Sequence, residues 1–179
     1  MPDMDVCDTE VVVRTARPQD YEAVGELTVE VYVGEGYVRP DSPYVHELAD
    51  TARRATSARV LVAVHADRVV GSLTVARPGT PYAETALPDE LEFRMLAVAR
   101  SARGLGAGTA LVRSVIDMAR AEGFAAVALT TMPAMAHARR IYDRFGFRPV
   151  PSRDWHTTVG DPLHVLRLPV DSAGAIQAD

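Results

Sequence analysis

LEFRMLAVARSARGLGAGTALVRSVIDMARAE, residues 91–122, is the stretch that decides the fold of this chain. Large apolar residues fill its first part, whereas its last part keeps apolar residues near one face at helical spacing. Three glycines lie between the two parts and mark a change of direction: Gly104, Gly106 and Gly108. The stretch therefore predicts a buried strand, a glycine-rich turn and an amphipathic helix.

The turn before this helix is a candidate site for phosphate. A helix begins with several unpaired N–H groups, and these groups and the helix dipole favour negative charge. A P-loop is excluded because Gly108 is followed by Thr109 and Ala110, without the lysine. A dinucleotide fingerprint fits poorly because the next strand ends in Thr130 and Thr131 rather than in an acid. A tight strand-to-helix turn that holds no ligand stays open as an alternative.

Two segments together carry a family resemblance. The turn matches Arg/Gln-x-x-Gly-x-Gly/Ala, the acetyl-CoA signature of the Gcn5-related N-acetyltransferase (GNAT) superfamily, at Arg103, Gly106 and Gly108. Further on, ARRIYDRFGFRPV resembles the second diagnostic segment of that superfamily, a helix that carries a tyrosine and ends at Gly-Phe. The resemblance extends over roughly residues 11–170.

Composition and charge limit the remaining choices. The chain has 179 residues, of which 47% are apolar and 24% charged, as expected for one globular domain. The net charge of −5 argues against a general nucleic-acid binder. No apolar run reaches the roughly 18 to 20 residues of a membrane span, and the five histidines have no metal-ligand spacing. Cys7 is the sole cysteine, so a cytoplasmic location is expected by default.

The remaining chain reads as short, alternating elements. We expect a lead over residues 1–10, one domain over 11–170 and a loose tail over 171–179. Strands are expected over 11–14, 60–65, 68–76, 91–98, 125–131, 147–150 and 163–168. Helices are expected over 18–31, 45–56, 109–122 and 135–144, with loops over 32–44 and 77–90. The fold class is mixed α/β, a single GNAT-like domain with a twisted mixed sheet of about six or seven strands and helices on both faces.

The resemblance implies acetyl-CoA as the co-substrate and assigns its binding residues. In the superfamily the central strand splays from its neighbour and leaves a V-shaped cleft for the pantetheine arm. By resemblance the main chain at Leu96, Ala97 and Val98 pairs with this arm and polarises the thioester carbonyl. The pyrophosphate falls to the turn, and the residues implied there are Arg103, Gly104, Leu105, Gly106, Ala107, Gly108 and Thr109.

Glu92 is the candidate general base, directly or through water. An alkylammonium has a pKa near 10.4, so it must lose a proton before it can attack. Glu92 lies in a strongly apolar strand, where a carboxylate is costly unless it is used or paired. Its place also matches a glutamate of many family members. An ion pair of Glu92 with Arg94 or Arg148 stays open, and Asp89 and Glu90 are reserve candidates.

Tyr142 is the candidate general acid for the departing thiolate. The resemblance places it at the superfamily's acid tyrosine, four residues before Gly146. Spacing alone is equally consistent with a tyrosine that packs in the core. One departure is Met135, where many relatives carry an asparagine near the cofactor arm, and His137 is the nearby side chain that could replace it.

The expected function is N-acetyltransfer from acetyl-CoA to a primary amine, on a small molecule or a peptide N-terminus, by direct attack in a ternary complex. A non-catalytic acyl-CoA sensor and a transferase of longer acyl groups remain alternatives. Tyrosines in residues 32–44, acids in residues 77–90, and Trp155 with His156 could enclose the amine. Those acids are equally consistent with a solvated loop. Relatives are often dimers, so a homodimer is also open.

Overall fold

The computed structural model describes residues 10–171. The lead expected over residues 1–10 and the tail expected over 171–179 therefore lie outside the described residues, except for Glu10 and Asp171. Cys7 also lies outside them. Within the described part, no helix combines the length and the apolar character that crossing a membrane requires. Nor do three or more His, Cys, Asp or Glu side chains of that part gather in a way that could hold a metal ion.

Strands and short helices alternate along the chain, close to the expected ranges. The strands are β1 (Val12–Thr15), β2 (Arg59–His65), β3 (Arg68–Ala76), β4 (Glu90–Val98), β5 (Ala126–Thr131), β6 (Arg148–Pro149), β7 (Trp155–His156) and β8 (Pro162–Pro169). The α-helices are α1 (Tyr21–Gly34), α2 (Tyr44–Ala49), α3 (Thr51–Ser57), α4 (Ala107–Ala121) and α5 (Ala136–Phe145). Three 3₁₀ turns complete the set: η1 (Pro18–Asp20), η2 (Arg100–Ala102) and η3 (Pro151–Arg153).

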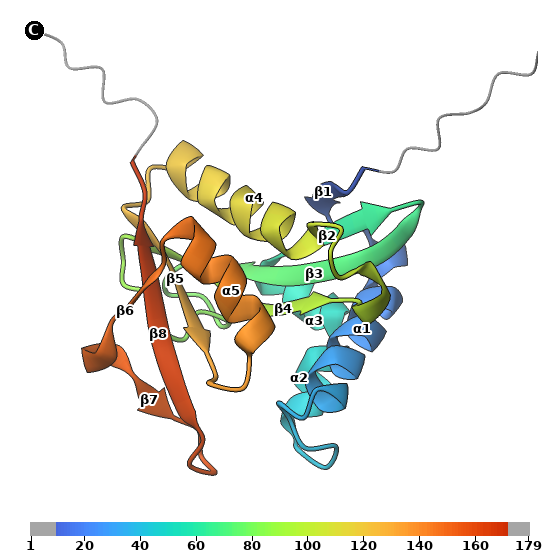
Figure 1. Cartoon of the computed structure of the whole chain (residues 1–179), viewed down its shortest axis with the longest axis horizontal. Helices are drawn as coiled ribbons and strands as arrows, with labels where there is room; N and C mark the ends of the chain where they lie inside the picture. The colour runs from blue at the N-terminus through green and yellow to red at the C-terminus, as the bar shows by residue number, and fades with distance from the viewer. Residues whose placement is uncertain (1–9, 172–179) are drawn as a thin grey trace, which may run out of the picture.

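The strands form one mixed sheet in the order β1-β2-β3-β4-β5-β8-β6, with β7 paired to β8 (Figure 1). The pair β4–β5 is parallel, and the other pairs are antiparallel. The sheet has eight strands, one more than the seven expected ranges, because the segment before β8 adds the two-residue strand β7; β6 is a shortened form of the strand expected over 147–150. The connection from β4 to β5 runs through α4, as parallel strands require.

Helices cover both faces of the sheet, as expected. One face packs under α4 and α5 in the main core, where Leu111, Val115 and Ile141 are buried. The opposite face packs against α1 and α2 through Leu27 and Leu48. Burying apolar side chains on both faces explains why β4 and β5 read as nearly continuous apolar runs.

Two local predictions had different outcomes. The hairpin turn at Ala66 and Asp67 is confirmed, and both residues have positive φ angles of 48° and 59°, as the turn of a twisted two-residue hairpin needs. The single helix expected over 45–56 is wrong, because the chain forms α2 and α3 with a break at Asp50. The Asp50 carboxylate accepts a hydrogen bond from the N–H of Arg53 and caps α3. Aspartate is a better helix cap than an interior residue, so the chain restarts there.

Candidate active site

Strands β4 and β5 pair only at their beginnings. The register joins Glu90, Leu91 and Glu92 to residues 126–128, and it goes no further. From Phe93 to Val98, β4 stays bonded to β3 while its other edge has no strand partner in the described part of the chain. The predicted V-shaped split is therefore present, and it opens beside the second half of β4.

A bulge reinforces this split. The β3–β4 register shifts between Ser72 and Thr74, so that two residues of β4 are inserted opposite Leu73. One of them, Met95, has a φ of 58°, an uncommon backbone for a residue with a side chain. A bulge bends the strand and re-aims its main chain, and bulges gather next to functional sites. The main chain of Leu96, Ala97 and Val98, which the resemblance assigned to the cofactor, follows directly after it.

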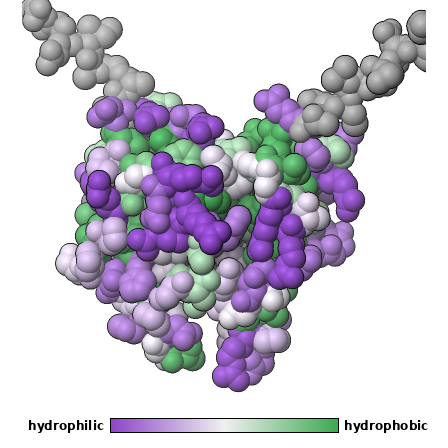
Figure 2. Space-filling view, in the orientation of Figure 1, coloured by the Kyte–Doolittle hydropathy of each residue, from purple (hydrophilic) through white to green (hydrophobic). Residues whose placement is uncertain are grey.

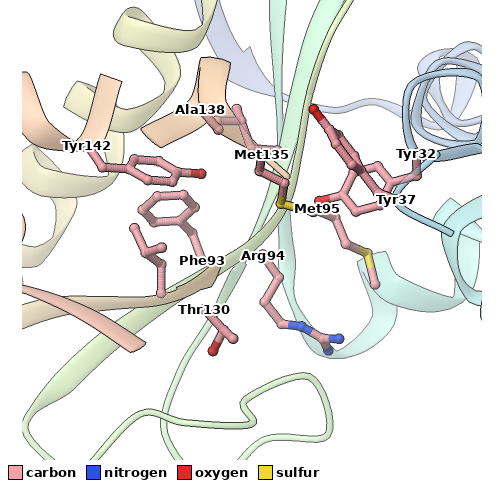
Figure 3. A pocket seen from close by; sticks show the side chains of 11 residues that line it. Tyr32, Tyr37, Phe93, Arg94, Met95, Thr130, Met135, Ala138 and Tyr142 are labelled. Carbon is pink, nitrogen blue, oxygen red and sulfur yellow. The ribbon is translucent and has the colours of Figure 1, made fainter. Parts of the chain in front are cut away.

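A small hollow of about 40 Å³ lies in the split. Its walls come from α1 and the residues after it, from β4, from β5 and from the start of α5 (Figure 3). Tyr32 and Tyr37 project from one side, and Tyr142 projects from the other with its hydroxyl directed into the gap. The side-chain oxygen of Thr130, which also lines the hollow, is buried without a hydrogen-bond partner among the described residues. Such an oxygen is costly to bury, so it marks a place where a polar ligand group fits.

The turn before α4 leaves main-chain N–H groups unused. Hydrogen bonds of the turn end with Leu105 N–H to the Ala102 carbonyl, and they resume with Ala110 N–H to the Gly106 carbonyl. Gly106 is the N-cap residue of α4, with a φ of 79°, and it has no side chain to cap the first turn. The N–H groups from Gly106 to Thr109 therefore remain available at the positive end of a helix of 15 residues. These unpaired donors fit a diphosphate.

Gly108 has a separate reason to be glycine. A Cβ atom at this position would lie 2.7 Å from Cδ1 of Ile141 and 3.3 Å from Cγ2 of Val98. The helix α4 thus starts directly against α5 and the end of β4. This close approach holds the turn, with its free amides, next to the open edge of β4.

Arg103 points to a partner that the sequence did not suggest. Its Nη2 lies 2.8 Å from Oε1 of Glu35, just after α1, and Nη2 of Arg100 lies at the same distance from that oxygen. The hydrogen bonds from Arg100 and Arg103 lower the pKa of Glu35. A phosphate would compete with Glu35 for these guanidinium groups. Glutamate at position 35 follows a helix in a polar loop, and nothing in its sequence context indicates a contact 68 residues away.

Tyr142 combines both interpretations that the sequence left open. Its side chain is 5% exposed and its ring packs edge to face on Phe93 and Phe147, with centroid distances of 5.8 Å in both pairs. Its hydroxyl nevertheless lines the hollow. Burial raises the pKa of Tyr142 well above its usual range, so the phenol is protonated at neutral pH. The ring is core, and the hydroxyl is an oriented donor at the split.

Glu92 is fully buried and does not line the hollow at the split. Its carboxylate accepts hydrogen bonds from the N–H of Glu84 at 2.7 Å and of Thr85 at 3.2 Å. Burial raises the pKa of Glu92, and these main-chain hydrogen bonds limit the rise. The alternative, an ion pair of Glu92 with Arg94 or Arg148, is absent among the described residues. Arg94 instead bonds Glu84, with 2.7 Å between Nη2 and Oε1.

The acids of residues 77–90 do not form the free acidic rim considered above. Glu90 is fully buried, and its carboxylate lies 2.8 Å from Nη2 of Arg153 and 2.6 Å from Nε of Arg167. It is therefore no reserve base, because both of its oxygens are engaged with arginine. Glu84 is paired with Arg94 but stays partly exposed, and Asp89 is exposed. Fixed counter-charges on β8 and η3 explain the correction, since sequence spacing does not reveal them.

Met135 and His137 occupy the start of α5 as expected, yet with different surroundings. Met135 lines the hollow, and its sulfur accepts a weak hydrogen bond from the hydroxyl of Thr131 at 3.8 Å. His137 is largely exposed, and partial loss of hydration together with the nearby charge of Arg103 lowers its pKa. His137 does not line the hollow, so it does not replace the asparagine of relatives there. Thr130 was missed because a threonine at the end of an apolar strand carries no signal in the sequence.

The sequence of this chain is similar to those of known proteins. The model of the acetyltransferase (GNAT) family matches residues 21–147. The Xenopus tropicalis protein named "Probable N-acetyltransferase camello" is 41% identical over 81 residues, which are 45% of this chain and 34% of that protein. The match thus spans about a third of the length of this curated relative.

Solved structures agree at the level of the fold. An acetyltransferase of the GNAT family from Staphylococcus aureus Mu50 superimposes with a TM-score of 0.68 at 16% identity, over 88% of this chain and 99% of that one. YncA from Salmonella typhimurium, solved with its cofactor acetyl-CoA, superimposes with a TM-score of 0.67 at 21% identity, over 94% of this chain and 99% of that one. The family model matches most of the chain, and the fold is an open mixed sheet that splits beside β4 and carries helices on both faces. The chain therefore belongs to the acetyltransferase (GNAT) family.

Proposed function

We propose that the protein transfers an acetyl group from acetyl-CoA to a primary amine, by direct attack of the amine in a ternary complex. The observation that carries this proposal is the open half of β4. There the unpaired strand edge and Tyr142 border one hollow, and a row of free N–H groups at the start of α4 lies beside the end of β4. Family membership and the acetyl-CoA of the YncA structure support the choice of cofactor.

The cofactor site follows from unsatisfied donors. The main-chain N–H groups from Gly106 to Thr109 would hold the diphosphate, and Arg103 would add positive charge once it leaves Glu35. Gly104 and Leu105 shape the turn, and Ala107 and Gly108 let the helix start close to β4. The open edge at Leu96, Ala97 and Val98 would pair with the pantetheine arm in place of a strand. Acetyl-CoA supplies the acetyl group in activated form, as a thioester.

The chain has three tasks during transfer. A main-chain N–H of the bulged part of β4 would stabilise the oxygen of the tetrahedral intermediate. The ammonium must lose a proton, and Glu92 would take it through a water, because burial raises its pKa and also keeps it from direct contact. The nitrogen then forms a bond to the acetyl carbon and gives up a second proton to solvent, and the carbon–sulfur bond breaks.

Tyr142 would serve the departing sulfur. A thiol has a pKa near 8.5, below that of the buried phenol, so the hydroxyl first stabilises the thiolate as a hydrogen-bond donor. CoA leaves as the thiol after the proton passes, and solvent returns a proton to Tyr142. Residues 10–171 contain no cysteine that could carry the acetyl group, which favours direct attack. The cytoplasmic location and the homodimer stay predictions from sequence and resemblance.

The test is thiol release from acetyl-CoA with a panel of primary amines, together with mass spectrometry of the products. We expect thiol release that depends on amine, and products heavier by one acetyl group. Acetyl-CoA binding without turnover on any amine would contradict the proposal and favour a sensor. Faster transfer from succinyl- or longer thioesters than from acetyl-CoA would change the donor while leaving the amine chemistry in place.

A further inference from the structure

A second, larger hollow lies beside the first. It has a volume of about 610 Å³, it is open to solvent, and Glu84, Thr85, Arg153 and Trp155 line it. Trp155 belongs to β7, where it pairs with Leu163 of β8. The residue is 36% exposed. A hollow of this size falls within the roughly 300 to 1,000 Å³ of small-molecule sites.

One ion pair joins the two hollows. Arg94 lines the small hollow at the split, and Glu84 lines the large one, with 2.7 Å between Nη2 of Arg94 and Oε1 of Glu84. A molecule bound against Glu84 would therefore contact a residue that is paired directly with the lining of the split. In the surface view the lower outline of the molecule is notched between the turn that joins β7 to β8 and the loop that joins α1 to α2 (Figure 2).

The positive groups around the large hollow are already engaged. Arg153 bonds the carboxylate of Glu90 with both terminal nitrogens, at 2.8 and 3.2 Å, and also bonds the Thr85 carbonyl. Arg94 bonds the Tyr82 carbonyl at 3.2 Å and the Tyr44 hydroxyl at 3.1 Å besides Glu84. Both guanidinium groups therefore already have a carboxylate partner.

Glu84 is the acid that lines this hollow. Only Oε1 of Glu84 takes part in a hydrogen bond or ion pair among the described residues, and the side chain is 37% exposed. Its position is fixed from below, because the N–H groups of Glu84 and Thr85 donate to the buried carboxylate of Glu92. Glu92 thus positions the loop that presents Glu84. A carboxylate beside an exposed indole is the pair of groups that recognises an organic ammonium.

We propose that this hollow is the acceptor site, and that it selects a primary amine whose ammonium group bonds Glu84 while its apolar body lies against Trp155. An acceptor that carries a carboxylate next to the amine would be disfavoured, since it meets Glu84 without a free arginine. This proposal rests on the proposed acetyl transfer, whose amine substrate it specifies.

The chain offers a direct readout of the site. Trp155 is the only tryptophan of the protein, so its fluorescence reports on this hollow. We would titrate the CoA-saturated full-length protein with phenethylamine and with phenylalanine, which differ by one carboxylate. We expect phenethylamine to change the fluorescence saturably, with an affinity roughly tenfold or more above that of phenylalanine.

Variants locate the binding. Glu84→Gln keeps the shape of the side chain and should weaken phenethylamine binding roughly tenfold, because a charge-assisted hydrogen bond is lost. Asp89→Asn removes an exposed acid of the same loop and should leave the affinity unchanged. Trp155→Ala should also weaken phenethylamine binding, measured by calorimetry. Because Trp155 is exposed, we expect the thermal unfolding curve of this variant to be unchanged, which excludes misfolding as the cause.

The outcomes separate the two proposals. Tighter binding of phenylalanine, or equal phenethylamine affinity in wild type and Glu84→Gln, would overturn the acceptor site even if other amines are acetylated. Binding of phenethylamine that depends on Glu84, without thiol release from acetyl-CoA, would support the site and refute the transfer. In the active protein, Glu84→Gln should raise KM for phenethylamine more than it lowers kcat, and the reverse split would also contradict an acceptor-binding role.

Discussion

The two halves of β4 differ more than any two neighbouring regions of the molecule. Over Glu90–Glu92 the strand pairs with β5, with Glu92 also paired to β3, and both acids are buried with their carboxylate contacts made inside the protein. Over Phe93–Val98 one edge is open, the backbone bulges at Met95, and the side chains line a hollow. One continuous apolar strand thus makes core contacts in its first half and, as we propose, binds the cofactor in its second.

The difference lies in how polar groups are satisfied. In the first half, arginines from β8 and η3 and main-chain amides from residues 84–85 complete the carboxylates. Around the second half, hydrogen-bonding groups have no partner among the described residues: the open strand edge, the Thr130 oxygen of β5 and the amides at the start of α4. Since proteins pair nearly all buried polar groups, a cluster of unpaired ones indicates a ligand.

The strongest way to break the first half is Glu90→Gln. Removing one partner of a buried ion pair leaves the arginines uncompensated, so we expect the free energy of unfolding to fall by about 3 kcal/mol. Urea unfolding would measure this loss. Acetyl-CoA affinity of the folded variant should stay unchanged, and Asp89→Asn, an exposed neighbour, serves as the matched control. A loss below that of the control would show that the Glu90 network is not structural.

The same network predicts a pH dependence of stability. Burial alone would raise the pKa of Glu90, but hydrogen bonds from Arg153, Leu87 and Arg167 outweigh it and lower the pKa. A carboxyl group with a lowered folded pKa stabilises the protein above its unfolded pKa, and this stability is lost as pH falls through the folded value. Unfolding curves between neutral and acidic pH should therefore converge for wild type and Glu90→Gln. Parallel curves would contradict this assignment.

Tyr142→Phe tests the second half. The hydroxyl has no hydrogen bond to the described residues, so its loss should change stability little, whereas kcat should fall about a hundredfold. Acetyl-CoA affinity should be unchanged. Steady-state kinetics and calorimetry measure the two effects, with Tyr21→Phe at the start of α1 as control. Unchanged turnover would remove Tyr142 from the mechanism and leave only its role in packing.

Arg103→Ala sharpens the assignment of the turn. Loss of a charge-assisted contact to phosphate should raise the Kd of acetyl-CoA roughly tenfold without changing kcat at saturation. Calorimetric titration would show it, and Arg68→Ala at the exposed β2–β3 hairpin is the matched control. Equal effects of the two substitutions would mean that Arg103 acts only through net charge.

The smallest expected effect belongs to Glu35→Gln. The present ion pair with Arg103 and Arg100 must be given up when phosphate binds, so the neutral variant should bind acetyl-CoA about threefold more tightly. The gain should shrink at high salt, which screens exposed charges. Weaker binding in the variant would instead indicate that Glu35 orients the arginines for the cofactor.

Local signals were enough to predict most of the fold. Apolar periodicity located α4, β5 and α5, and Gly146 ends α5 with a φ of 91°, as its position after the helix predicted. Ala66 and Asp67 formed the expected turn. The break at Asp50 was missed because capping by its side chain competes with continuing the helix, and periodicity does not weigh the two.

The site was predictable where main chain and family motif define it, and less so where side chains from distant elements meet. The glycine turn and Tyr142 lie at the split as the resemblance implied. The partners of Glu90 lie 63 and 77 residues away in the sequence, and the partner of Arg103 lies 68 residues away. Charge alone does not identify such distant partners. Glu92 could not be distinguished from its exposed neighbour Glu84, because their roles depend on which loop amides face the carboxylate.

The most direct test of the open half of β4 is an amide NMR titration of the full-length protein with acetyl-CoA. We predict saturable shifts that are largest for the amides of Gly106 to Thr109 and of Leu96 to Val98, with those of Glu90 to Glu92 nearly unmoved. Failure to take up acetyl-CoA, or shifts concentrated in the paired half of the strand, would contradict the account.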